Sequence, residues 1–337
     1  MTQHDSSRLN LEPPQEWSDE RFRLAHRLVE EASLLSRDIQ DRQAHRALAK
    51  TDSSPVTVAD LSVQVLIALS LRRDFPSDRL IAEETSEQLE ADEALLQQLQ
   101  DLLAPRTGRC SKREILESFQ FGKDGDSGFS WVLDPIDGTK GFLRGDQYAI
   151  ALAGLDGSDL RFGLLGCPRL KTTGAERGDG VIGGAYRGKG AWQKSLGSEG
   201  WSRVAVSARS QAQEVRLLRS FEASHTNEGQ LESFVEAEGI AAPPVRLDSQ
   251  AKYLLLARGD AEAVVRCLSP KRPDYREKIW DQAAGAIMVT EAGGRIEDLC
   301  GKPLDFSTGP TLSRNVGVRA HNGLLDDLNW SILMPGA

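Results

Sequence analysis

Hydrophobic residues at the start of the chain follow a helical period. Apolar side chains recur at intervals of three and four across residues 17–48 and again across residues 61–71, which predicts two amphipathic helices joined by a loop. Shorter surface helices are expected at residues 89–103 and 112–119. The first part of the chain is therefore predicted to form a mainly helical layer.

Strand-like patterns dominate from residue 129 onward. Alternating aromatic and branched residues predict a buried strand at 129–133, following a shorter strand at 78–85. Further strands are expected at residues 147–155, 160–166, 181–186 and 190–193. The Asp156-Gly157 pair is a hairpin signal between two of them. We therefore expect an α+β N-terminal part with antiparallel strands.

Helical and strand patterns alternate after about residue 207. The predicted order is strand 216–221, helix 230–238, strand 245–247, helix 249–257, strand 261–266, helix 281–292, strands 295–299 and 315–318, and helix 324–333. Such alternation is typical of a layered α/β domain. The predicted fold class is α/β, with a flexible tail at residues 1–15, an N-terminal α+β domain at 16–206 and a C-terminal α/β domain at 207–337.

Composition limits the location and the partners of the protein. A chain of 337 residues is long enough for about two domains, no apolar run is long enough to cross a membrane, and the polar N-terminus lacks a signal peptide's apolar segment. The four cysteines form no CxxC pair, which favours a reducing compartment. A net charge of −9 argues against a nucleic acid polymer but allows a small phosphorylated ligand. We expect a cytoplasmic protein, monomeric, with no membrane partner.

The stretch around Asp134-Pro-Ile-Asp-Gly-Thr139 combines a strand end with several oxygen donors. Pro135 stops the strand and the following Asp-Gly supplies a turn. Asp134 and Asp137 can then reach one hard cation, with the Ile136 carbonyl as a third oxygen ligand and the Thr139 hydroxyl beside a bound water. This is the outline of a Mg²⁺ site. The alternative is that Asp-Pro and Asp-Gly form a turn and nothing more.

Three other acidic positions allow a functional or a purely structural interpretation. Asp60 has the spacing of a capping box with Thr57, so it could simply stabilise a helix start. Glu83, next to another glutamate at the end of a predicted strand, could point into a cleft or lie on a solvated turn. Asp281 at a predicted helix start could be an N-cap or could complete a second metal site.

Basic and hydroxyl groups in the second half suggest a phosphate site. Ser249 and Lys252 lie on one side of a predicted helix start, and a helix N-terminus with a lysine binds phosphate readily. Arg266 at a strand end could add a fork of donors. The alternatives are a capping serine, a solvated lysine and an arginine paired with a surface acid.

Taken together, these stretches resemble the lithium-sensitive, Mg²⁺-dependent phosphatase superfamily of inositol monophosphatase. The resemblance rests on four motifs in the right order across about residues 20–330: Lys50 with Ser54-Pro-Val-Thr57 and Asp60, Ala82-Glu-Glu84, Trp131 to Thr139, and Trp280-Asp-Gln-Ala-Ala-Gly285 followed by Glu291-Ala-Gly-Gly294. It implies an αβαβα sandwich. Two departures stand out: Ala82 occupies a position where glycine is usual, and Gln282 one where histidine is common.

Within that superfamily the chain is similar to the eukaryotic-type 3'(2'),5'-bisphosphate nucleotidases. The similarity lies in Lys140-Gly-Phe-Leu-Arg-Gly-Asp-Gln-Tyr-Ala149, Leu247-Asp-Ser-Gln-Ala-Lys-Tyr253 and Glu277-Lys-Ile-Trp-Asp281. It implies hydrolysis of adenosine 3',5'-bisphosphate (PAP) to AMP, action on 3'-phosphoadenylyl sulfate (PAPS), inhibition by Li⁺, and a place in sulfur metabolism.

The resemblance also implies roles for individual residues. Two or three Mg²⁺ ions would be held by Glu83, Asp134, the Ile136 carbonyl, Asp137 and Asp281. Asp60 and Thr139 would activate the attacking water. The substrate would contact Gly138, Thr139, His225, Ser249, Lys252, Arg266 and Asp281.

Two rival functions remain at this point. An inositol (poly)phosphate 1-phosphatase would use the same metal chemistry with a different substrate pocket. A non-catalytic sensor that binds nucleotide or metal would not need the pair Asp60 and Thr139, whose presence favours an enzyme.

Overall fold

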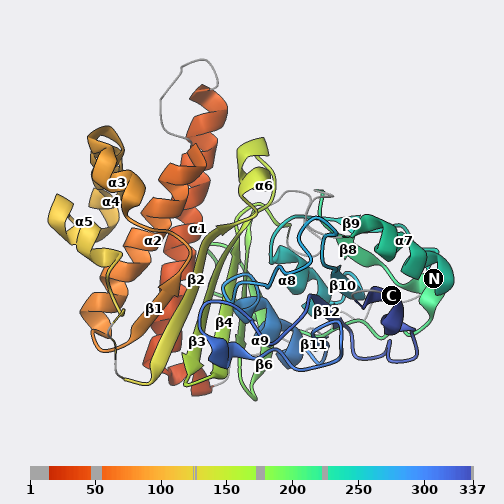
Figure 1. The fold of residues 1–337 in the computed structure, drawn as a ribbon. Helices are drawn as coiled ribbons and strands as arrows, with labels where there is room; N and C mark the ends of the chain where they lie inside the picture. The colour runs from red at the N-terminus through yellow and green to blue at the C-terminus, as the bar shows by residue number, and fades with distance from the viewer. Residues whose placement is uncertain are drawn as a thin grey trace.

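The structure is a computed structural model that describes residues 15–46, 55–123, 125, 127–171, 179–221 and 227–334 of the 337-residue chain. Its elements stack in five layers, helix, sheet, helix, sheet and helix, as Figure 1 shows from left to right. Three groups of buried apolar side chains fill the spaces between the layers. The predicted α/β class and the αβαβα sandwich are confirmed.

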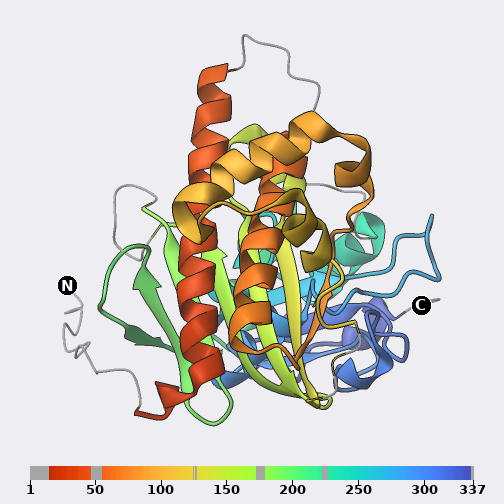
Figure 2. The same ribbon diagram turned by 90° about the vertical axis from the view of Figure 1, so that its left-hand side faces the viewer.

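The first helical layer covers one face of the larger sheet. It contains α1 (Glu20–Arg46) and α2 (Pro55–Asp74), which lie across the sheet in Figure 2. Leu35 of α1 and Leu66 of α2 belong to the same buried cluster as Trp131 of the sheet. Three shorter helices complete this side of the molecule: α3 (Glu87–Ala91), α4 (Glu93–Thr107) and α5 (Lys112–Ser118).

The larger sheet has seven strands that neighbour one another in chain order. The strands are β1 (Arg79–Ala82), β2 (Phe129–Asp137), β3 (Ala149–Asp156), β4 (Asp159–Cys167), β5 (Val181–Tyr186), β6 (Gly190–Ser195) and β7 (Ser202–Val204). β1 and β2 are parallel, and the other pairs are antiparallel as predicted. Because Ala82 pairs with Leu133, the residues that follow these two positions, Glu83 and Asp134, lie side by side.

The central helical layer separates this sheet from a smaller one. It contains α8 (Ala251–Ala257) and α9 (Ala283–Glu291), which are buried along almost their whole length. The smaller sheet has the order β11, β12, β10, β8, β9. Its strands are β8 (Leu217–Arg219), β9 (Val245–Arg246), β10 (Ala263–Arg266), β11 (Arg295–Glu297) and β12 (Val318–His321).

The last layer and several short helices complete the fold. α7 (Glu228–Ala237) covers the outer face of the smaller sheet, and α6 (Thr139–Arg144) directly follows β2. The described part of the chain also contains 3₁₀ helices at Gln15–Ser18, Ala212–Glu214, Phe306–Thr308 and Trp330–Leu333.

Asp60 lies inside a helix, so the predicted capping box was wrong. α2 begins at Pro55, five residues before Asp60, and not after it. Proline suits the first turn of a helix because its missing N–H would have had no partner there. The Asp60 side chain is consequently free of a capping role and is 5% exposed.

Other predictions of secondary structure need smaller corrections. α9 begins at Ala283, so Asp281 lies in the turn before the helix and is not its N-cap. The strand expected at 315–318 begins instead at Val318. Asn315 lies outside the strand, and its side-chain oxygen accepts a hydrogen bond from the Asp305 N–H at 2.8 Å. The predicted helix at 89–103 is split into α3 and α4, and β7 was not predicted.

The predicted C-terminal helix at 324–333 was wrong. The segment contains turns and a single 3₁₀ turn at Trp330–Leu333. The Trp330 indole N–H donates to the Leu325 carbonyl at 2.9 Å. In an α-helix that carbonyl would accept from a backbone N–H four residues later. The ring also stacks on Phe234 and His321, so tertiary packing overrides the helical pattern.

The division into domains at residues 206 and 207 stays a proposal. It is supported by the separation of the two sheets along the chain, since β7 ends at Val204 and β8 begins at Leu217. α9 of the second part nevertheless packs against β4 of the first, so the two parts share a core. None of the helices in the described part of the chain is both long and apolar enough to cross a membrane.

Candidate active site

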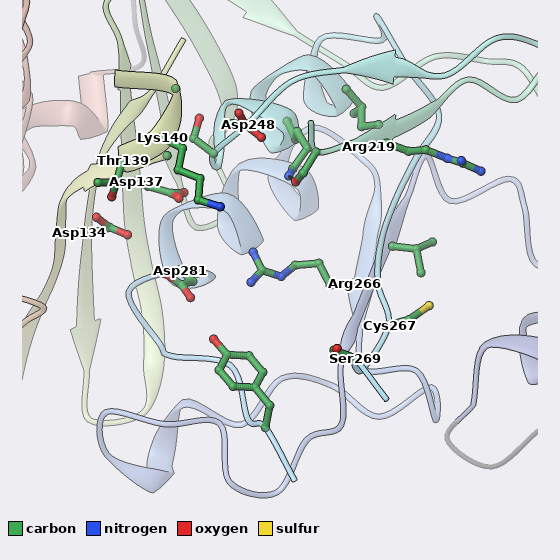
Figure 3. Close-up of a pocket in the computed structure, with 18 of the residues that line it drawn as sticks. Asp134, Asp137, Thr139, Lys140, Arg219, Asp248, Arg266, Cys267, Ser269 and Asp281 are labelled. Atoms are coloured by element: carbon green, nitrogen blue, oxygen red, sulfur yellow. Dashed lines mark hydrogen bonds between the residues drawn. The ribbon is translucent and has the colours of Figure 1, made fainter. Parts of the chain in front are cut away.

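A cavity of about 450 Å³ lies where the ends of β1 and β2 meet the starts of α6 and α8. Figure 3 shows Asp134, Asp137 and Thr139 on one side of it, with Asp281 below them. The guanidinium group of Arg266 points toward these acidic residues from the opposite side. The cavity therefore brings together residues from both halves of the chain.

An irregularity in β2 places two carboxylates on one side of the sheet. Residues three apart on a regular strand point to opposite faces. In the pairing with β3, however, Asp134 lies opposite Ala151 and Asp137 opposite Ala149, so β2 contains one extra residue. Pro135 lies in this segment and has no N–H to offer the ladder. The resulting bulge turns both carboxylates into the cavity.

The turn after β2 is in close contact with the start of α8. Gly138 has a φ of 92°, and a Cβ at this position would lie 3.0 Å from the Cβ of Ser249. Ser249 itself has a φ of 71°, a conformation that residues other than glycine rarely adopt. Its hydroxyl accepts from the Ala251 N–H at 3.2 Å. This strained contact holds Ser249 at the cavity wall.

Gln250 connects the β2 carboxylates to the segment that carries Asp281. Its backbone N–H donates to Asp137 at 2.6 Å. Its side-chain amide donates to the Trp280 carbonyl at 2.7 Å and accepts from the Gly285 N–H at 3.1 Å. One buried glutamine therefore positions residues on both sides of the cavity.

A second glutamine holds the segment after β1. The side-chain amide of Gln64 on α2 donates to the Glu84 carbonyl at 2.8 Å and accepts from the Glu84 N–H at 3.0 Å. Glu83 is thereby held with its side chain in the cavity wall. Ala82 has no positive φ, so the glycine that is usual in the resembled family is not required by this backbone.

Burial and mutual repulsion favour the protonated forms of the cavity's carboxyl groups. Burial, followed by the charges of Glu84 and Asp137, raises the pKa of Glu83 to about 7. Burial also raises the pKa of Asp281 to about 8, although Arg266 opposes the shift. The pKa of Asp134 lies well above its usual value for the same reasons, burial first and Asp137 second.

Asp60 and Thr139 lie next to these acids. Burial, then the charges of Glu84 and Glu83, raises the pKa of Asp60 well above its usual value. The Thr139 hydroxyl donates to the Ile136 carbonyl at a long 3.5 Å. Both groups are thus close to the carboxylates, one from α2 and one from the start of α6.

The donor set fits a hard divalent cation such as Mg²⁺. Oδ1 of Asp134 is buried and has no hydrogen-bond partner among the described residues, and a cation bound by oxygen would satisfy it and relieve the repulsion. As the side chains stand, no three Asp, Glu, His or Cys groups in the described ranges converge as ion ligands. Like charges favour rotamers that keep them apart, so binding requires side-chain rotation.

The opposite wall of the cavity is cationic. Lys252 is 6% exposed, and its ammonium donates to the Ser220 hydroxyl at 2.6 Å. Burial, followed by the charge of Arg266, lowers the pKa of Lys252 to about 8. Arg266 pairs with Glu277 at 2.9 Å. The readings of a solvated lysine and of an arginine at a surface ion pair are therefore wrong.

The structure brings nearly all predicted site residues to this cavity. Its lining includes Glu83, Asp134, Ile136, Asp137, Gly138, Thr139, Ser249, Lys252, Arg266 and Asp281. Asp60 lies beside them on α2, and His225 lies outside the described residues. The roles of these residues stay predictions.

The two positioning glutamines were not predicted from the sequence. Gln250 lies between Ser249 and Lys252 in the motif Leu247 to Tyr253, and that position was its one signal. Gln64 has no signal at all, because its role depends on a contact with a residue 20 positions away. Lys140 and Tyr275 also line the cavity and were not predicted as site residues.

The chain belongs to the inositol monophosphatase family, whose sequence model matches residues 17–330. This match confirms the superfamily that the motifs indicate.

Within this family, the chain is similar to curated bisphosphate nucleotidases. The chain is 43% identical over 296 residues to the 3'(2'),5'-bisphosphate nucleotidase of Oryza sativa, covering 81% of this chain and 82% of the relative. It is 36% identical to the enzyme of the same name from Emericella nidulans, with 90% and 94% covered. It is 37% identical to 3',5'-bisphosphate nucleotidase 2 of Arabidopsis thaliana, with 87% and 90% covered.

Solved structures share the fold at lower identity. The IMPase of Thermotoga maritima superposes with a TM-score of 0.61 at 20% identity, covering 93% of this chain and 96% of that one. The extragenic suppressor protein suhB of Bartonella henselae gives a TM-score of 0.63 at 18% identity, with 94% and 99% covered.

Proposed function

We propose that this protein is a Mg²⁺-dependent phosphomonoesterase that converts PAP to 5'-AMP and phosphate. The observation that carries the proposal is the division of one cavity into an acidic wall with Asp134 and Asp137 and a cationic wall with Lys252 and Arg266. A bisphosphate substrate needs two binding sites, one for the phosphate that reacts and one for the phosphate that remains. The names of the curated relatives support the same substrate.

The acidic wall would hold the metal. Glu83, Asp134, Asp137, Asp281 and the Ile136 carbonyl supply the oxygen ligands for two or three Mg²⁺ ions. When bound, Mg²⁺ cancels the charge of the phosphate and lowers the pKa of water. The family's general dependence on Mg²⁺ supports this assignment.

We assign the attacking water to Thr139 and Asp60. The Thr139 hydroxyl would orient the water, and Asp60 would accept its proton, for which a raised pKa makes it a better base. The water oxygen forms a bond to phosphorus, the bond from phosphorus to the 3'-oxygen breaks, and that oxygen takes up a proton. No covalent intermediate with the protein is required.

The cationic wall would bind the rest of the substrate. Lys252 and Arg266 face the cavity and would contact the second phosphate, with the hydroxyl of Ser249 beside them. Gly138 lines the cavity at the turn and would contact the nucleotide there, while its missing side chain makes room for Ser249. His225, predicted to lie near the base, lies outside the described residues.

Three finer statements belong to the same proposal. PAPS is an additional substrate, because it carries the same 3'-phosphate. Li⁺ inhibits the enzyme by competing for a Mg²⁺ position, as the family's sensitivity to lithium suggests. The protein acts as a monomer in the cytoplasm and takes part in sulfur metabolism; light scattering and cell fractionation test the first two parts.

Phosphate release from a panel of substrates tests the function. PAP, PAPS, inositol 1,4-bisphosphate, inositol 1-phosphate and 5'-AMP are compared with Mg²⁺, with EDTA and with added LiCl. The expected result is the highest kcat/KM for PAP, loss of turnover in EDTA, and inhibition by LiCl. Preference for an inositol substrate would overturn the pocket assignment, and absence of all turnover would favour a binding protein.

A further inference from the structure

Two hydrogen bonds and an ion pair connect Tyr253 to Arg266 through the buried interior. The Tyr253 hydroxyl donates to Oε1 of Gln282 at 2.6 Å, and Nε2 of Gln282 donates to Oε2 of Glu277 at 2.8 Å. The same Glu277 oxygen forms an ion pair with Nη2 of Arg266 at 2.9 Å. Four side chains are thus joined in one relay: Tyr253 of α8, Gln282 at the N-cap of α9, Glu277 of the loop before it, and Arg266 of β10.

Burial makes the geometry of this relay specific. Gln282 is 0% exposed, Tyr253 2% and Glu277 5%. A buried polar group that loses its partner keeps the whole cost of its desolvation, because water cannot replace the bond. Each member of the relay is therefore confined to the one arrangement in which both of its neighbours are satisfied.

The relay ends at the Arg266 guanidinium, which has further N–H donors that Glu277 does not contact. Glu277 contacts one terminal nitrogen, Nη2, of the Arg266 guanidinium, while Nε of Arg266 is buried without a partner among the described residues. Figure 3 shows this guanidinium pointing toward Asp281. Because the guanidinium is planar, holding one of its nitrogens restricts the direction in which the other donors point.

The same glutamine also fixes Asp281. Gln282 directly follows Asp281, and the carbonyl of Trp280, directly before it, accepts the side chain of Gln250. Both anchors come from the start of α8, through Gln250 on one side and Tyr253 on the other. The relative placement of Asp281 and Arg266 therefore depends on Gln282.

We propose that Gln282 is a positioning residue that holds Arg266, through Glu277, at the distance from Asp281 that a substrate with two phosphates requires. The inference rests on the proposed function, in which Asp281 lies beside the reacting phosphate and Arg266 beside the other. A glutamine can serve the relay because its amide donates at one end and accepts at the other, in every physiological protonation state. Selectivity for a bisphosphate over a monophosphate is the property that Gln282 controls.

The variant Gln282→Met tests the relay with little change of volume. It removes the hydrogen bonds at both ends of the side chain and introduces no charge. The measured quantity is the ratio of kcat/KM for PAP to kcat/KM for adenosine 3'-monophosphate, which lacks the second phosphate. We expect this ratio to fall about tenfold, the size of effect that the loss of a hydrogen bond to a charged group produces. An unchanged ratio overturns the proposal, even if both activities fall together.

Two further variants separate positioning from general stability. Gln282→His keeps one donor and one acceptor and is expected to retain more than half of the selectivity ratio, so a loss equal to that of Gln282→Met contradicts the relay. Gln193→Met makes the same change at a buried glutamine of β6, outside the cavity lining. It is expected to lower the melting temperature without changing the ratio.

A double-mutant cycle tests whether the effect passes through Arg266. Arg266→Lys keeps the positive charge but loses the planar set of guanidinium N–H donors. We expect this change alone to lower the ratio of kcat/KM for PAP to kcat/KM for adenosine 3'-monophosphate. Adding Gln282→Met to Arg266→Lys should lower the ratio little further. If the two substitutions lower the selectivity ratio by factors that simply multiply, Gln282 does not act through Arg266.

The relay and the proposed function fail in different ways. A wild-type protein that hydrolyses neither nucleotide disproves the function, whereas active protein with an unaltered ratio in Gln282→Met disproves the relay alone. If Gln282→Met does not fold, Tyr253→Phe replaces it, because it removes one hydroxyl at the far end of the relay. A drop of the ratio of about threefold is then expected, and no drop contradicts the proposal.

Discussion

Asp134 and Asp137 lie three residues apart on β2 and still point into the same cavity, because β2 contains one residue more than β3 between them. Without the bulge at Pro135, one of the two carboxylates would face the helical layer of α1 and α2 instead. The bulge is thus the local feature of the backbone on which the acidic wall depends.

The first prediction concerns these two carboxylates. Asp134→Asn and Asp137→Asn each keep the size of the side chain but lose a charged ligand for Mg²⁺. We expect kcat to fall roughly 10³-fold, as is typical when a group that stabilises transition-state charge is removed. Steady-state kinetics with Mg²⁺ measures the effect. Asp159→Asn, at the exposed first residue of β4, is the matched control with normal turnover; near-normal turnover of either cavity variant would refute the metal site.

The second prediction concerns the strained serine. Ser249→Gly relieves the φ of 71°, whereas Ser249→Ala keeps the strain, so the glycine variant should be more stable by about 1 kcal/mol. Both variants lose the hydroxyl and should bind PAP more weakly. Chemical denaturation and KM measure the two effects separately. Equal stability of the two variants would show that the backbone here is not strained.

The third prediction links pH, metal and stability. The pKa values of Glu83, about 7, and Asp281, about 8, lie above those of the unfolded chain. Between about pH 4 and pH 8 the folded state therefore holds more protons than the unfolded state, so its stability falls as pH rises. In EDTA the melting temperature should decrease over this range, and Mg²⁺ should raise it more at pH 8 than at pH 5.

A calorimetric scan at the two pH values tests this third prediction. Asp281→Asn should flatten the pH dependence and weaken the response to Mg²⁺, while Asp159→Asn should leave both unchanged. A melting temperature at pH 8 that does not respond to Mg²⁺ would contradict the metal assignment, independently of any activity.

The fourth prediction concerns Lys252. Its pKa of about 8 lies below the usual value for lysine, so its positive charge is lost as pH rises through about 8. KM for PAP should therefore rise above this pH, and KM for adenosine 3'-monophosphate should rise less. Lys252→Arg, which stays charged, should remove the rise, whereas an unaltered pH profile in that variant would assign the titration to another group.

Local signals in the sequence predict much of the fold and the acidic wall. The residues from Asp134 to Thr139 carry their own strand, proline and turn, so both the strand end and its carboxylates are recognisable without a structure. The seven strands of the larger sheet follow chain order, which is why all of them except β7 are recovered by alternation and hairpin signals.

What the sequence does not predict depends on contacts between distant residues. The Trp330 side chain donates a hydrogen bond to the Leu325 carbonyl and stacks on Phe234. These contacts prevent the C-terminal helix that the hydrophobic periodicity favours. Gln64 matters only because α2 passes the end of β1. The relay through Gln282 joins residues up to 29 positions apart in a single bond, and no local pattern indicates it.

Phosphorus NMR of the reaction with PAP shows which of the two phosphates the protein removes. Purified protein is incubated with PAP and Mg²⁺, and the remaining monophosphate is identified by its resonance and by comparison with authentic standards. We expect inorganic phosphate and 5'-AMP, with no adenosine 3'-monophosphate at any time. Accumulation of adenosine 3'-monophosphate would place the wrong phosphate at the acidic wall, and unreacted PAP would contradict the proposed enzyme altogether.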